Sequence, residues 1–194
     1  MILPVVQYGD PRLRQKGTRV NSITPAIQTL IGDMFETMYA TRGIGLAAQQ
    51  VGQALQLTVL DIRPVTDRPS TLQINGAEAD PNSLMPMVLL NPELKPLGET
   101  VPGPEGCLSF PEVYGDVVRP ESISVKALDG KGDQIEFSCG GLLARAIQHE
   151  TDHLHGILFI DRMDKKTKAE LQDDIDLIQA DTKAKLKKHP TSRG

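Results

Sequence analysis

Apolar side chains recur at helical spacing in two stretches of the chain. The first stretch follows Thr24 and Pro25, and its apolar positions are Ile27, Leu30, Ile31, Met34, Phe35 and Met38. The second runs from Leu142 to His155, and Gly156 is suited to end it. Steps of three and four residues place such side chains on one face of a helix, and threonine before proline is typical of a helix start. The pattern predicts two amphipathic helices.

A third helix, more charged than these, is predicted over about 165–188. Thr167 and Glu170 have the spacing of a capping box, in which both side chains hydrogen-bond to free N–H groups at a helix start. We expect the last residues, 189–194, to form a flexible tail.

Short strands are predicted where β-branched and apolar residues gather between turn residues. These segments are 55–62, 87–90, 122–128 and 134–137, with a turn at Asp129–Gly130 before the last. Residues 63–86 carry prolines, charges and an Asn75–Gly76 pair. That composition indicates a long surface loop with room for a hairpin at the pair.

Length and composition restrict the class of protein. A chain of 194 residues is long enough for one hydrophobic core and too short for two ordinary domains with a linker, so we expect one domain over 1–194. A net charge of -4 argues against a surface built to grip nucleic acid. Because no apolar run is long enough for a bilayer and no signal-peptide pattern is present, we expect a cytoplasmic protein without membrane association.

The second predicted helix carries His-Glu-Thr-Asp-His at residues 149–153. Residues four apart share a helix face, so both imidazoles can bind one metal ion while Glu150 transfers protons beside them. The alternative is a solvent-exposed face that happens to carry these side chains. Because the same face is apolar at Leu142 and Ala146, the polar groups point inward and need partners. The motif therefore favours a metal site.

A catalytic metal usually has three protein ligands, so one more is required. Phe159 stands where a metzincin would have its third histidine. Cys107 lies in a segment rich in glycine and proline that predicts a tightly shaped loop, and it is the best candidate. On spacing alone, a small buried hydrophobic role for Cys107 is about equally good. Cys139 is a weaker candidate, and both thiols are expected to be reduced.

The glycine-bearing stretch 43–52 superficially suggests nucleotide binding. It follows a predicted helix and has Ala48 where the dinucleotide fingerprint needs a third glycine, so that function is excluded. Its small residues permit close backbone approach, and the Gln50 amide is a potential hydrogen-bond donor.

Three segments, GIGLAAQQ (43–50), EGCLS (105–109) and QHETDHLHG (148–156), resemble the signature motifs of peptide deformylases in order and separation. The resemblance extends over nearly the whole chain. It implies an α+β fold in which antiparallel β-sheets wrap around a central HExxH-bearing helix, with an N-terminal and a C-terminal helix. It also implies an enzyme of protein biosynthesis that removes the N-formyl group from the N-terminal methionine of newly synthesised polypeptides and releases formate.

The resemblance implies roles for particular residues. One divalent metal ion per chain would be held by Cys107, His149 and His153. Fe(II) is expected in the cell, with Zn(II), Ni(II) or Co(II) able to replace it, although a thiolate and two imidazoles also suit zinc. The implied catalytic groups are the general acid/base Glu150 and two donors to the formyl oxygen, the Gln50 amide and the Leu108 N–H.

Around the metal, the resemblance implies that Glu105 and Arg119 pair to brace the ligand-bearing segment. A surface ion pair of little energetic value is the alternative. The residues expected at the substrate pocket and groove are Ile44, Gly45, Glu105, Gly106, Tyr114 and Leu142.

Two other functional classes stay open from the sequence. A metallopeptidase also uses HExxH, on internal amide bonds. A structural metal site needs four protein ligands, and only three are convincing. We expect a monomer whose partners are N-formylmethionyl nascent peptides. The basic end of the C-terminal helix is ordinarily a solvated face, and ribosome docking through Lys183, Lys185, Lys187 and Lys188 is a hypothesis.

Overall fold

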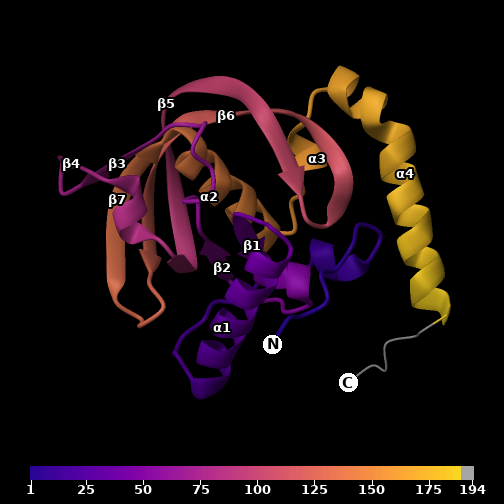
Figure 1. Ribbon diagram of the computed structural model, residues 1–194, viewed down its shortest axis with the longest axis horizontal. Helices are drawn as coiled ribbons and strands as arrows, with labels where there is room; N and C mark the ends of the chain where they lie inside the picture. The colour runs from indigo at the N-terminus through magenta and orange to yellow at the C-terminus, as the bar shows by residue number, and fades with distance from the viewer. Residues whose placement is uncertain (189–194) are drawn as a thin grey trace.

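The computed structural model describes residues 1–188, so the expected flexible tail at 189–194 lies outside the described part. Figure 1 shows a strongly curved sheet that partly encloses one helix, α2. The helices are α1 (Pro25–Ala40), α2 (Gly141–Leu154), α3 (Phe159–Arg162) and α4 (Lys165–Lys188). The strands are β1 (Gly45–Ala47), β2 (Leu57–Leu60), β3 (Ser70–Ile74), β4 (Ala77–Ala79), β5 (Met87–Cys107), β6 (Phe110–Leu128) and β7 (Gln134–Gly140).

The strands form one antiparallel sheet in the order β1-β2-β5-β6-β7-β3-β4. The α+β fold around the HExxH-bearing helix is confirmed, but the prediction of short strands at 87–90 and 122–128 is wrong. β5 and β6 are 21 and 19 residues long and arch over α2 (Figure 1). The pairing of β5 with β6 shifts in register after Leu90 and after Leu97, and these shifts let the two strands bend. Prolines between these two positions made the strand hard to recognise in the sequence.

The segment 63–86 is more ordered than the predicted surface loop. The hairpin at Asn75–Gly76 is confirmed, and both turn residues have positive φ angles, 52° and 77°, as a tight two-residue turn requires. β3 also pairs with β7, with Leu72 opposite Cys139. The segment therefore belongs to the sheet.

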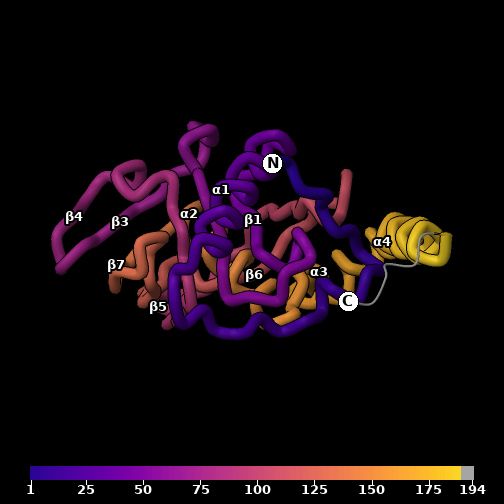
Figure 2. Tube along the Cα trace, turned by 90° about the horizontal axis from the view of Figure 1, so that it is seen from below, coloured from indigo at the N-terminus to yellow at the C-terminus, as the bar shows by residue number. Residues whose placement is uncertain are grey.

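The helices begin and end for local reasons. The Thr24 side chain accepts a hydrogen bond from Ile27 N, which confirms the predicted start of α1. Gly156, with φ 72°, follows α2 as predicted. The predicted capping box at Thr167 is wrong, because Asp164 accepts the hydrogen bond from Thr167 N and α4 starts at Lys165. Figures 1 and 2 show α4 along one side of the molecule.

Helix α2 is buried along almost its whole length. From Leu142 to Leu154 every side chain is buried, including those of the HExxH motif. Apolar residues of α2 pack against the sheet in one core cluster, and α1 covers β1 and β2 in another. The polar groups of α2 are therefore withdrawn from water and need partners inside the protein. No helix within residues 1–188 is long and apolar enough to cross a membrane.

Candidate metal centre

Two elements bring the candidate metal ligands together. His149 and His153 lie on α2, and Cys107 is the last residue of β5, not part of an irregular loop as predicted. One ligand atom from each residue lies within 4.8 Å of the others, and Cys107 Sγ is 3.4 Å from His153 Nε2. This is the one such group of His, Cys and acidic residues among residues 1–188. Cys139 is buried in the core instead, and both thiols are free.

The chemistry of this donor set fits a divalent ion. A sulfur and two imidazoles are ligands that zinc and similar metals accept, and three protein ligands leave a position for water or substrate. Burial lowers the pKa of His153, which favours the neutral imidazole that a metal ligand must be. Within the described residues, Glu150 Oε2 is buried without a hydrogen-bond partner. A buried carboxylate oxygen, without a partner among the described residues, therefore lies beside the three converging ligands.

Glu105 fixes the orientation of the first histidine. Its Oε1 lies 2.8 Å from His149 Nδ1, which leaves Nε2 of that ring for a metal. Arg119 donates to both carboxylate oxygens, at 2.6 and 2.9 Å. Burial alone would raise the pKa of Glu105, but hydrogen bonds from His149 and Arg119 lower it to about 2. The expected Glu105–Arg119 pair is present, and it is buried, not a surface ion pair.

Sequence reasoning missed two members of this network. Arg119 Nη1 donates to Asp152 Oδ2 at 2.8 Å, and Arg145 Nη1 donates to Glu105 Oε2 at 2.9 Å. Asp152 lies inside the HExxH motif, and Arg145 is four residues before His149. Charged residues inside a predicted buried helix were the available signal, because a buried charge requires a partner.

Glu150 lies directly against the backbone of β1. A Cβ atom placed on Gly45 would lie 2.4 Å from Glu150 Oε1, so the carboxylate occupies the space that the glycine leaves open. Burial raises the pKa of Glu150 to about 7. A carboxyl group with that pKa can both accept and release a proton near neutral pH.

The Gln50 side chain is held with its NH₂ group toward the metal ligands. Its Oε1 accepts a hydrogen bond from Ala47 N at 2.9 Å. Its Nε2 donates to Ser109 Oγ at 3.3 Å and lies 3.5 Å from Cys107 Sγ. The backbone N–H of Ala47 therefore decides which end of the amide faces the site.

A cavity of about 630 Å³ opens beside these groups. It contains six predicted site residues besides Cys107, His149 and Glu150, namely Ile44, Gly45, Gln50, Gly106, Leu108 and Tyr114. Glu105 and Leu142 do not line it: Glu105 is enclosed by its ion pairs, and Leu142 packs in the core. Sequence reasoning missed other lining residues, among them Arg42, Phe110 and Glu112.

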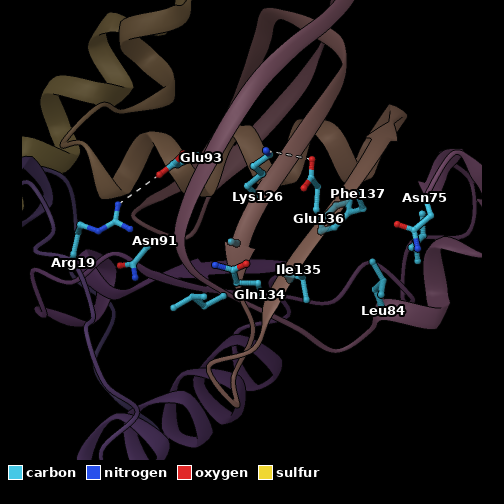
Figure 3. A pocket seen from close by; sticks show the side chains of 13 residues that line it. Arg19, Asn75, Leu84, Asn91, Glu93, Lys126, Gln134, Ile135, Glu136 and Phe137 are labelled. Atoms are coloured by element: carbon cyan, nitrogen blue, oxygen red, sulfur yellow. Dashed lines mark ion pairs between the residues drawn. The ribbon is translucent and has the colours of Figure 1, made fainter.

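A larger cavity, of about 920 Å³, lies elsewhere, against β5, β6 and β7 (Figure 3). Its charged side chains pair with one another, Arg19 with Glu93 at 3.7 Å and Lys126 with Glu136 at 3.5 Å. None of the described residues around it belongs to a group that could hold a metal. The smaller cavity is therefore the candidate site.

A histidine pair and a glutamate on one buried helix, with a cysteine sulfur completing three ligands, define the class of metal-dependent hydrolases. Comparison with known proteins identifies the family. The polypeptide deformylase family model matches residues 2–169. A peptide deformylase of Opitutus terrae is 45% identical, over 98% of this chain and 100% of the relative, and one of Zymomonas mobilis is 47% identical over 84% and 87%.

Solved structures that resemble this chain are also peptide deformylases. A peptide deformylase from Legionella pneumophila superposes with a TM-score of 0.77 at 36% identity, over 93% of this chain and 96% of that one. One from Synechococcus elongatus, solved in complex with actinonin, gives 0.76 at 40% identity, over 91% and 85%. The chain belongs to the peptide deformylase family, whose members are metal-dependent hydrolases that remove the N-formyl group from nascent polypeptides.

Proposed function

We propose that the chain hydrolyses N-formylmethionyl peptides to formate and free methionyl peptides, with one divalent ion held by Cys107, His149 and His153. The observation that carries the proposal is the convergence of these ligand atoms, within 4.8 Å, beside Glu150 in a solvent-open cavity. When bound, the ion would supply a Lewis acid that lowers the pKa of water and polarises the formyl carbonyl.

Glu150 is the proposed general base and then general acid. Its buried Oε2, without a partner among the described residues, would accept a proton from the attacking water and deliver it to the departing amine. The contact between its other oxygen and Gly45 limits how far the carboxylate can turn. A carboxylate held in one place loses little entropy in each proton transfer.

Gln50 and Leu108 are the proposed donors to the formyl oxygen. Negative charge builds on that oxygen as water adds to the carbonyl, and donors already in place stabilise it without rearranging. The hydrogen bond from Ala47 N keeps the Gln50 amide oriented for this role. Both residues line the cavity, as do the proposed substrate contacts Ile44, Gly106 and Tyr114.

Glu150→Gln separates a catalytic site from a structural metal site. The variant should retain one metal ion per chain and lose at least 100-fold in formate release from a formyl-Met peptide, because a carboxamide cannot accept the proton. Glu136→Gln, which changes an exposed glutamate in a distant ion pair, is the matched control and should keep full activity. Cleavage of internal peptide bonds without formate release would instead indicate a metallopeptidase.

Fe(II) is the proposed metal in the cell, with Zn(II), Ni(II) and Co(II) as replacements. The thiolate ligand supports a transition metal over magnesium or calcium, since those ions prefer oxygen ligands. Anaerobic purification, elemental analysis and a formate assay on the same sample would identify the ion. Iron bound to a cysteine predicts loss of activity in air, which anaerobic handling should prevent.

Ribosome docking through the end of α4 remains a proposal as well. Lys183, Lys185, Lys187 and Lys188 are exposed there, and one of them pairs with Asp181. Ribosomal RNA presents phosphates that such lysines attract in a salt-dependent way. Removing the four positive charges should weaken co-sedimentation with ribosomes, and unchanged sedimentation would reject the idea.

A further inference from the structure

Arg145 is a buried guanidinium outside the cavity lining and without a role in the chemistry above. It projects from α2, four residues before His149. Nη1 donates to Val117 O on β6 at 2.7 Å, and Nη2 donates to Val101 O on β5 at 3.0 Å. Nη1 also donates to Glu105 Oε2 at 2.9 Å. One side chain therefore ties α2 to both long strands and to Glu105.

The backbone at Gly103 leaves space for this guanidinium. A Cβ atom at Gly103 would lie 2.8 Å from both Cζ and Nη2 of Arg145. Gly103 is not among the glycines with positive φ, so its conformation alone does not call for glycine. Residue 103 is glycine because the Arg145 guanidinium packs against its backbone and leaves no room for a side chain.

The donors to Glu105 come from two elements, β6 and α2. Arg119, on β6, donates hydrogen bonds to both carboxylate oxygens, and His149 Nδ1 is hydrogen-bonded to Oε1. Arg145 adds a donor from α2, the helix that carries both histidine ligands. Glu105 lies two residues before Cys107 on β5. The Arg145–Glu105 contact therefore links the helix with the histidines to the strand with the sulfur.

We propose that Arg145 is a positioning residue for the metal centre, acting through Glu105 on His149 and on the spacing between α2 and the end of β5. This inference rests on the metal site proposed above. A guanidinium that served stability alone would contribute to folding without affecting the ligands. The two roles differ in what they do to metal retention below the unfolding temperature.

Arg145→Met tests the proposal in the Co(II)-loaded enzyme. The variant should release Co(II) to a chelator about 10-fold faster than the parent, at a temperature where both are folded, since partners of metal-bound histidines typically affect affinity by 10- to 100-fold. Its visible Co(II) spectrum should change, and kcat should fall with KM unchanged because Arg145 does not line the cavity. Arg12→Met, which removes a guanidinium from Asp10, is the matched control.

Gly103→Ala provides a second route that keeps the arginine. The new methyl group should displace the guanidinium and accelerate Co(II) release, and this effect should vanish in the Gly103→Ala/Arg145→Met double variant, because the two residues act through one contact. If Arg145→Met does not fold, Gly103→Ala decides alone.

Release rates and spectra equal to those of the parent, in whichever of these variants folds, would overturn the positioning role. A parent protein that binds no Co(II) would instead refute the metal site itself.

Discussion

The contact between Gly45 and Glu150 allows a sharp test of the proposed mechanism. In Gly45→Ala the new Cβ would lie 2.4 Å from Glu150 Oε1, whereas ordinary contacts begin at 3.4 Å, so the carboxylate must move by about 1 Å. A displacement of about 1 Å in a catalytic site can cost about 100-fold in rate. The nearest atoms to the new methyl group all belong to Glu150, and the metal ligands are not among them. We therefore expect kcat to fall about 100-fold while metal content stays at one ion per chain.

Gly32→Ala is the matched control for this substitution. Gly32 lies in α1, and no atom beyond its chain neighbours and the adjacent helix backbone lies within 4 Å of the added methyl group. The variant should therefore keep full activity and gain up to about 1 kcal/mol in stability from helix propensity. Formate release under steady-state conditions gives kcat, and elemental analysis gives metal content. If kcat of Gly45→Ala stays within about threefold of the parent, the Glu150 carboxylate is not packed tightly against Gly45. If the variant loses its metal, the substitution disturbs the metal ligands as well as the base, contrary to this reasoning.

Two further predictions test a catalytic donor and a distant ion pair. Gln50→Glu keeps an acceptor for Ala47 N but removes the donor, so kcat should fall by about two to three orders of magnitude in the formate assay, and near-parental kcat would exclude Gln50 as a donor. Hydrogen bonds from Arg63, chiefly, hold the pKa of Asp61 below its usual 3.8, so this pair stabilises the fold above that pH and loses its contribution as the pH falls toward the folded-state pKa. In urea unfolding, Asp61→Asn should therefore lose less stability than the parent between pH 5 and pH 2, and equal losses would contradict this account.

Features that depend on local spacing can be predicted from the amino-acid sequence. The apolar period set α1 and α2, and the four-residue step between His149 and His153 placed both imidazoles on one helix face. The Asn75–Gly76 pair was sufficient to locate a hairpin, because few other residue pairs adopt positive φ twice in succession. Such features follow from conformational preferences that act within a few residues of the chain.

Features that join distant segments of the chain depend on how the whole chain folds. Spacing left Cys107 undecided between a ligand and a buried apolar residue, and the pairing of β5 with β6 brings its sulfur 3.4 Å from His153. The glycine- and proline-rich segment around Cys107, which the sequence predicts to be a loop, belongs to the two long strands β5 and β6 that this pairing forms. Leu142, predicted at the substrate pocket, packs in the core and does not line the cavity. Periodicity indicates that a side chain points inward, but not whether it enters the core or a cavity.

Arg145 shows most clearly what could not be predicted from the sequence. Its place in a predicted buried helix indicated that it needs a partner, but its partners lie 28 to 44 residues away on β5 and β6, and the sequence does not identify them. A buried charge is tolerated only where several acceptors meet it, and such acceptors are assembled by folding, not by proximity along the chain.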